Sequence, residues 1–265
     1  MLKKNHDFKK KFGQNFIKNF KVIIDTLELL EMKESDTILE IGPGDGRFTE
    51  GIIPNVSQVD LVEIDSELVS FLKDKFSPAL LEQFNCNIEI INEDILNFDL
   101  KRYKGTSYKV FGSLPYNISK PIISKFVETN FKPKKCIFII QKEVAEAYTA
   151  KPPKATFLSN YAHIFSDITY EFTVDKQYFH PRPKVHGAVI QIRPHCLEKI
   201  DNPVNFSKFL KNAFRTPRKK LINTLKSIYK DTNWKTIFNN LKLHENLRSA
   251  EVEFKTWIKI YNEFD

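Results

Sequence analysis

Short apolar runs alternate with amphipathic stretches along most of the chain. Apolar residues recur at helical spacing from Asn19 to Met32, which predicts a first helix. Buried strands are then predicted at 37–41, 59–64, 87–91, 108–111 and 135–140, with helices after positions 46, 65, 118 and 141. This alternation predicts a doubly wound α/β sheet that binds ligands at the carboxyl ends of its strands. Two later runs, 168–174 and 184–192, can add antiparallel strands at the sheet edge.

The pattern changes after Arg193-Pro194. From about residue 203, helical periodicity and basic clusters replace the β-branched runs. We therefore expect two domains, an α/β domain over residues 1–195 with a basic N-terminal arm, and a small helical domain over residues 196–265.

Composition narrows the class of protein. The 265 residues include 41 Lys and Arg against 33 Asp and Glu, a net charge of +8. This surplus favours a polyanionic partner such as nucleic acid, although a modest positive balance is also a common solubility feature. Three scattered cysteines and six scattered histidines predict reduced thiols, a cytoplasmic location and no metal site. Neither a signal peptide nor an apolar run of the roughly 20 residues that span a bilayer is evident, so we expect no membrane association.

Candidate binding residues follow the first three predicted strands. Gly42, Gly44 and Gly46 form a GxGxG turn that lets the backbone approach a ligand, although tight strand-to-helix turns also use glycine. Glu63 ends the second strand, where an acid can accept hydrogen bonds from two ribose hydroxyls, whereas Asp65 fits a helix N-cap better. Asp94 follows the third strand and is suited either to an adenine amine or to another N-cap.

The fourth strand ends in GSLPYNIS, residues 112–119. Alone, this stretch indicates an ordinary turn. With the glycine turn and the two acids it completes, on one edge of the sheet, the set that an S-adenosylmethionine (SAM) site needs. A dinucleotide dehydrogenase has no need of the Pro-Tyr turn, and a serine hydrolase would need a GxSxG elbow that FGSLP lacks.

In their order and spacing these motifs resemble the KsgA/Erm family of rRNA adenine N6-dimethyltransferases, over nearly the whole chain. The stretches that carry the resemblance are KKFGQNF (10–16), EIGPGDG (40–46), VEID (62–65), EDI (93–95), LPYNIS (114–119), QKEVAEA (141–147), YFHPRPKV (178–185) and FRTPRKKLINTL (214–225). The last stretch is more similar to the small-subunit rRNA branch than to the antibiotic-resistance branch.

The resemblance implies a Rossmann-like SAM-dependent methyltransferase domain and a C-terminal rRNA-binding domain. It implies that SAM binds at Gln14, Asn15, Ile17, Gly42, Gly44, Glu63, Asp94, Ile95 and Ser113, and that the catalytic residues are Ser113, Leu114, Pro115, Tyr116 and Phe179. Acceptors on the N6 amine would turn its lone pair toward the methyl group, so alignment carries most of the rate. Tyr116 and Phe179 would stack on the extruded base.

The partner implied is the rRNA of an immature small subunit, with the enzyme acting as a monomer. Phosphate contacts are expected from Lys10, Lys11, Arg182, Lys184, Arg215, Arg218, Lys219 and Lys220, with a solvated charged face as the alternative. We interpret the chain as a SAM-dependent dimethyltransferase of adenine N6 in 16S rRNA. A dimethyltransferase of 23S rRNA and a small-subunit assembly factor with weak activity are the alternatives.

Two positions depart from the family pattern. The family's turn begins with Asn where this chain has Ser113, and residues 151–160 lack the glycine that usually precedes Leu-Ser in the loop beside the target base. A serine hydroxyl is a shorter acceptor that also donates. We therefore expect a slow enzyme rather than an inactive one.

Overall fold

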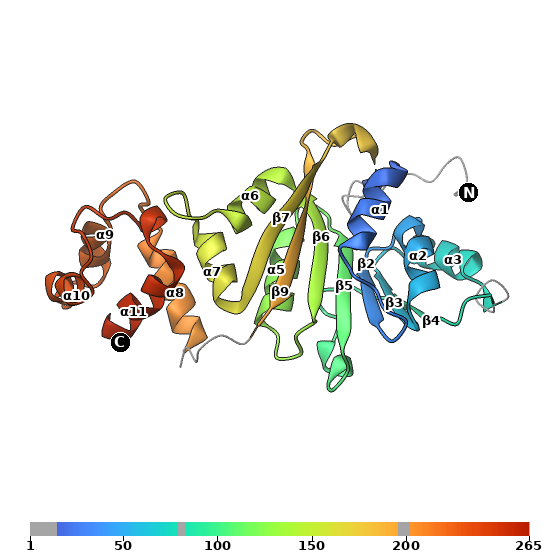
Figure 1. Cartoon of the computed structure of the whole chain (residues 1–265), viewed down its shortest axis with the longest axis horizontal. Helices are drawn as coiled ribbons and strands as arrows, with labels where there is room; N and C mark the ends of the chain where they lie inside the picture. Colours follow the sequence, from blue (N-terminus) through green and yellow to red (C-terminus); the bar gives the residue numbers. More distant parts are fainter. Residues whose placement is uncertain (1–14, 79–82, 196–201, 265) are drawn as a thin grey trace. The chain divides into compact units, whose positions relative to one another are not determined.

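The computed structural model describes residues 15–78, 83–195 and 202–264. Its centre is a seven-stranded sheet in the order β4-β3-β2-β5-β6-β9-β7 (Figure 1). The strands are β2 (Thr37–Ile41), β3 (Gln58–Glu63), β4 (Asn87–Asn92), β5 (Tyr108–Ser113), β6 (Lys135–Gln141), β7 (Ser166–Val174) and β9 (Gly187–Pro194). Strands β2 to β6 run parallel, and β9 pairs antiparallel with β6. The predicted α/β sheet is confirmed, including the antiparallel addition at its edge.

Helices follow the strands as the alternation predicts. They are α2 (Arg47–Ile52), α3 (Ser66–Lys75), α5 (Ser119–Glu128) and α6 (Lys142–Thr149). Phe48 of α2 packs on Phe111 with ring centroids 4.6 Å apart, and Phe126 of α5 packs on Phe138 at 6.0 Å. Phe111 pairs with Ile137 in the register, so Phe138, one residue farther along β6, points to the opposite face. Helices therefore cover both faces of the sheet.

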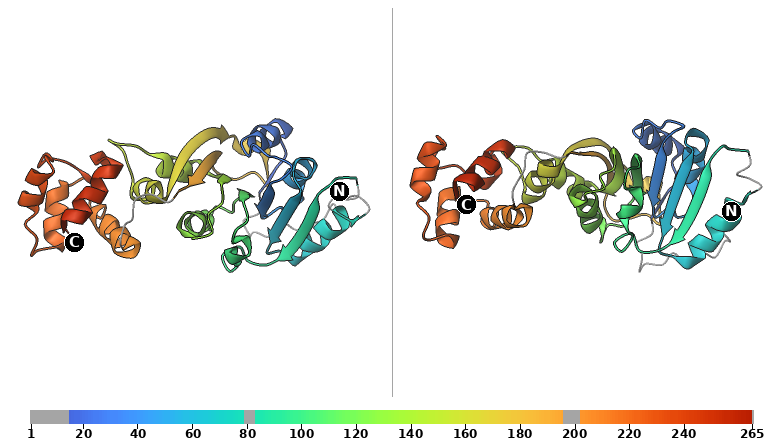
Figure 2. Two further views of the ribbon diagram at one scale, coloured as in Figure 1. Left: turned by 60° about the horizontal axis from the view of Figure 1, so that its bottom comes forward. Right: turned by 90° about the horizontal axis from the view of Figure 1, so that it is seen from below.

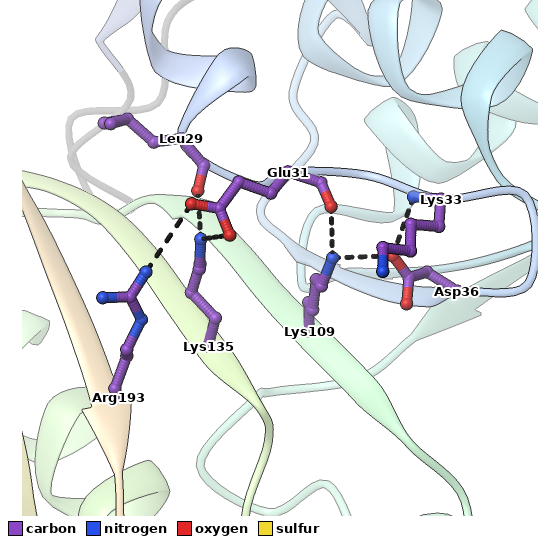
Figure 3. Close-up of polar contacts among 7 residues, drawn as sticks. All are labelled: Leu29, Glu31, Lys33, Asp36, Lys109, Lys135 and Arg193. Atoms are coloured by element: carbon purple, nitrogen blue, oxygen red, sulfur yellow. Dashed lines mark hydrogen bonds and ion pairs between the residues drawn. The ribbon is translucent and has the colours of Figure 1, made fainter.

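Two buried lysines fasten the segment between α1 (Phe20–Glu28) and β2 to the amino ends of the central strands (Figure 3). Lys109 Nζ lies 2.6 Å from the Glu31 carbonyl and 2.6 Å from Asp36 Oδ2. Lys135 Nζ lies 2.8 Å from the Leu29 carbonyl and 2.7 Å from Glu31 Oε2, and this ion pair lowers the pKa of Glu31. The network holds the C-terminal end of α1. The N-terminal end of α1 follows a short strand, residues 16–17, which lines the pocket described below.

The chain folds into two compact units. One contains the residues up to Ala145 together with Ile168–Pro194, and the other contains Glu146–Asp167 with His195–Asp265. The functional domains expected at 1–195 and 196–265 stay predictions.

The second unit is helical. It contains α7 (Phe157–Phe165), α8 (Pro203–Ala213), α9 (Leu221–Ile228), α10 (Trp234–Asn240) and α11 (Phe254–Phe264), the last four of which appear together in Figure 2. Phe209 lies at the centre of an aromatic core, where its ring centroid is within 6.4 Å of those of five neighbours, Tyr229, Trp234, Trp257, Tyr261 and Phe264. Burial of the apolar surface of these rings stabilises the unit.

Two local expectations differ from the structure. The first helix ends at Glu28 rather than Met32, because Glu31 takes a left-handed φ of 47° and its carbonyl is bound by Lys109. Residues 157–160 of the stretch 151–160 are helical, because Thr156 and Ser159 form a capping box that starts α7.

Candidate active site

A glycine turn follows β2 and opens a pocket at the carboxyl ends of the parallel strands. Gly42 and Gly44 have φ values of 62° and 61°, a region that favours glycine. A Cβ added at Gly42 would meet no atom within 4 Å, whereas one at Gly44 would lie 2.3 Å from the Phe16 ring. The turn therefore leaves open space at Gly42 and lets Phe16 pack directly on the backbone at Gly44.

Glu63 is held at the end of β3 by backbone donors. Its Oε2 accepts from the Gly44 N–H at 3.3 Å and its Oε1 from the Asp65 N–H at 3.0 Å. The side chain is buried, and burial raises the pKa of Glu63 although the two backbone hydrogen bonds oppose the rise. Each oxygen keeps a lone pair for a ligand, so the carboxylate is suited to two hydroxyl donors. Asp65 caps α3 through the Glu67 N–H, as expected.

Asp94 lies in the turn that follows β4 and lines the pocket. Its Oδ1 accepts from the Leu96 N–H at 2.9 Å and closes a side-chain turn, but residues 95–97 are not helical, so the expected N-cap alternative is wrong. The side chain also lines the pocket, and no described residue donates to Oδ2. Lys125 Nζ fixes the following loop by donating to the carbonyls of Leu96 at 3.0 Å and Phe98 at 2.6 Å. One oxygen thus shapes the loop while the other is free for a ligand amine.

The Ser113-Leu114-Pro115-Tyr116 turn follows β5 and lines the same pocket as these acids. Leu114 N–H donates to the Ile139 carbonyl at 2.9 Å, which fastens the turn to β6. Within the described residues, the Ser113 hydroxyl makes no hydrogen bond. The buried Tyr116 hydroxyl also has no described partner, and burial raises the pKa of Tyr116 to about 12. The turn therefore presents a free hydroxyl and an aromatic ring to a ligand.

A short ribbon covers the pocket from another side. Strands β1 (Phe16–Ile17) and β8 (Phe179–His180) pair antiparallel, with Ile17 opposite Phe179. Phe179 is buried and lines the pocket. A Cβ on Gly187 would lie 2.8 Å from the Phe179 ring, so this glycine makes room for it. The ribbon brings Phe179 to the same site as Asn15 and Ile17, although Phe179 is far from them in the sequence.

Four ionisable residues of the pocket lining were not predicted from the sequence, namely Asp45, Glu93, Glu40 and Arg47, and the last two have informative partners. Glu40 is buried on β2, its Oε2 accepts from Thr49 Oγ1 at 2.7 Å, and its Oε1 has no described partner. Burial raises the pKa of Glu40 to about 8, so the carboxyl is mostly protonated at neutral pH. Arg47 begins α2 and also lines the pocket. Both lie within or next to the quoted glycine motif, but the motif gives no information on side-chain partners.

A single pocket therefore contains nearly all the predicted cofactor and catalytic residues: Asn15, Ile17, Gly42, Gly44, Glu63, Asp94, Ile95, Ser113, Leu114, Pro115, Tyr116 and Phe179. Gln14 lies outside the described residues. The roles assigned to these side chains stay predictions.

The basic residues expected to contact RNA are surface residues where the structure describes them. Arg182 and Lys184 are exposed just after β8. In the helical unit Arg215, Arg218, Lys219 and Lys220 are exposed in the connection between α8 and α9. Among the described residues none of these six side chains forms an ion pair, so all are available to phosphates. Lys10 and Lys11 lie outside the described residues.

The described part of the chain contains no group of three His, Cys, Asp or Glu side chains that could hold a metal ion. It also contains no helix with the length and apolar character needed to cross a membrane.

Comparisons with known proteins find relatives over nearly the whole chain. A family model described as ribosomal RNA adenine dimethylase matches residues 5–265. The ribosomal RNA small subunit methyltransferase A of Fusobacterium nucleatum is 33% identical over 97% of both chains, and that of Coxiella burnetii is 34% identical over 98% of both.

Two solved structures share the fold. A dimethyladenosine transferase from Plasmodium falciparum has a TM-score of 0.76 and 24% identity, covering 94% of this chain and 97% of its own. The 23S rRNA methyltransferase ErmE has a TM-score of 0.74 and 22% identity, covering 93% and 98% respectively. At these identities the likeness establishes the Rossmann-like methyltransferase fold.

Proposed function

The chain belongs to the ribosomal RNA adenine dimethylase family, and on that premise we propose that it transfers methyl groups from SAM to the N6 amine of adenines in 16S rRNA. The observation that carries this proposal is that Glu63, Asp94 and the Ser113–Tyr116 turn all line one pocket. The relatives with 33–34% identity are named for the small subunit, which favours 16S over 23S rRNA.

The residues present fit SAM. Glu63 offers two acceptors for the ribose hydroxyls, and Asp94 Oδ2 offers one for the adenine amine. The bare backbone at Gly42 leaves room beside the turn. Two buried polar atoms without a described partner, Glu40 Oε1 and the Tyr116 hydroxyl, both belong to residues that line this pocket. Such atoms are costly to bury alone, so a polar ligand in the pocket would relieve that cost.

When bound, SAM supplies an electrophilic methyl group on a positively charged sulfur. The protein's task is to align the N6 amine, whose lone pair is otherwise delocalised into the adenine ring. The Ser113 hydroxyl and the Leu114 carbonyl accept from the amine and direct its lone pair toward the methyl group. Tyr116 and Phe179 hold the extruded base between their rings. Alignment is the main contribution to the rate. The transferred methyl group would leave S-adenosylhomocysteine behind and bring its positive charge to the amine, which would lose that charge by releasing a proton, so no general base with a perturbed pKa is needed.

Ser113 gives the assembly-factor alternative its support, because its hydroxyl is a shorter acceptor than the expected Asn. The exposed basic residues would contact rRNA phosphates and give affinity that depends on salt. We place the enzyme in the cytoplasm, where it acts on immature small subunits as a monomer.

The function is tested by incubating the protein with methyl-labelled SAM and each ribosomal subunit from cells that lack the dimethylation. We expect label in 16S rRNA of the immature small subunit. Label in 23S rRNA alone would favour the large-subunit alternative. Tight binding to small subunits without any label would favour the assembly factor.

A further inference from the structure

Acidic side chains outnumber basic ones in the lining of the pocket. The acidic side chains are Asp45, Glu63, Glu93 and Asp94, besides the mostly protonated Glu40, and within the described residues Arg47 provides the single cationic side chain of the lining. Lys75 is near the same turn, where its Nζ donates to the Asp45 carbonyl at 2.6 Å and pairs with Glu50 at 2.8 Å, but it does not line the pocket.

SAM carries both signs of charge. Its sulfonium and its amino group are cationic and suit an acidic pocket, whereas its carboxylate needs cationic or amide donors when it leaves water. We propose that Arg47 binds the carboxylate of SAM and thereby distinguishes SAM and its product from adenosine compounds without that group. This inference rests on the proposed use of SAM.

The hydrogen bonds of Arg47 leave part of its guanidinium free. Nε donates to Asp45 Oδ2 at 2.7 Å, and one terminal nitrogen, Nη1, donates to the Ile17 carbonyl at 3.2 Å. The other, Nη2, has no partner among the described residues. These two bonds fix the plane of the group, and a guanidinium held in one plane binds a carboxylate with defined geometry. Asp45 therefore orients Arg47 without occupying all its donors.

The Ile17 bond also connects the carboxylate to the ribbon formed by β1 and β8. Ile17 lies opposite Phe179, which we assign to the target base. A carboxylate on Arg47 would fix the guanidinium further and so hold β1 in place. Arg47 is thus assigned a direct role toward SAM and a positioning role toward the ribbon.

The experiment compares two ligands by calorimetry at fixed salt. One is S-adenosylhomocysteine, and the other is S-adenosyl-3-thiopropylamine, which is the same molecule without its carboxylate. The proteins are the unmodified chain, Arg47→Met and the matched control Lys75→Met. In the unmodified chain we expect the carboxylate to improve affinity on the order of 10-fold or more, as for hydrogen bonds to charged groups.

Arg47→Met should remove most of this difference in affinity. It should weaken the binding of S-adenosylhomocysteine on the order of 10-fold, whereas the affinity for S-adenosyl-3-thiopropylamine should change by less than about 3-fold. Lys75→Met should lower the affinity for both ligands equally. Lys75 holds the glycine turn through the Asp45 carbonyl but does not line the pocket, so its loss would loosen the turn without removing a ligand contact. Equal losses in Arg47→Met would show that Arg47 only holds β1, and equal affinities in the unmodified chain would show that the carboxylate is not recognised. Either result overturns the inference, whereas failure of the unmodified chain to bind either ligand would contradict the proposed use of SAM itself.

Discussion

Replacing Glu63 with alanine should weaken SAM binding without unfolding the protein. The carboxylate has two oxygens, each held by one backbone N–H, and each has a lone pair left for a ribose hydroxyl. Losing hydrogen bonds to a charged acceptor costs about 1.5–3 kcal/mol, which corresponds to a rise in Kd of roughly 10- to 150-fold. Calorimetric titration with SAM measures this rise in Kd directly.

Glu67→Ala is the matched control, because Glu67 is an exposed acid four residues farther along that does not line the pocket. It removes the same charge and should leave the affinity within about twofold, the range of weak surface effects. The pH gives a second readout. Burial raises the pKa of Glu63, so SAM affinity should fall as the pH is lowered toward that pKa, and Glu63→Gln should lose this dependence. Unchanged SAM affinity in Glu63→Ala would refute the ribose assignment.

Three further predictions concern the rate, the stability and the RNA surface. Ser113→Asn should raise the single-turnover methylation rate on immature small subunits at saturating SAM, with RNA affinity nearly constant. The increase should be smaller than the factor of roughly 10²–10³ in rate that a whole preorganised hydrogen bond contributes, and a lower rate would show that the pocket is adapted to serine. Glu40 has its pKa raised to about 8 in the folded chain, so the free energy of unfolding should fall as pH rises from about 4.5 to about 8. Urea denaturation should show that Glu40→Gln removes up to about 5 kcal/mol of this dependence, and an unchanged pH profile would contradict it. Neutralising Arg218, Lys219 and Lys220 should lower the slope of log affinity against log salt by about 0.7–0.9 for each phosphate that the protein no longer neutralises, and an unaltered slope for small subunits would argue against this surface.

The parallel strands were predictable because burial on both faces makes them nearly continuous apolar runs. The residues TILEI are β2 at its predicted bounds, 37–41, and residues 108–111 lie within β5. Turns rich in Gly, Pro and Asp separate these runs from the helices. The topology then brings the strand ends together, so residues that follow different strands, such as Gly42 and Glu63, were expected at one edge.

The remaining features depend on interactions that no local pattern encodes. Strands β1 and β8 have two residues each, too few for any periodicity, and they pair although most of the chain separates them in sequence. Glu40 has apolar neighbours in sequence, but only the structure shows that one of its oxygens lacks a described partner. Arg47 follows the glycine turn as an ordinary first residue of a helix, and its position in an otherwise acidic lining becomes visible only when several separate segments meet.

The most direct test of the account is mass spectrometry of 16S rRNA nucleosides, from immature small subunits incubated with SAM and this protein and from cells with and without its gene. We predict N6,N6-dimethyladenosine in both the treated subunits and the cells that carry the gene, and its absence without the protein. Unmodified adenines in 16S rRNA under both conditions, with the protein bound to the subunits, would contradict the account.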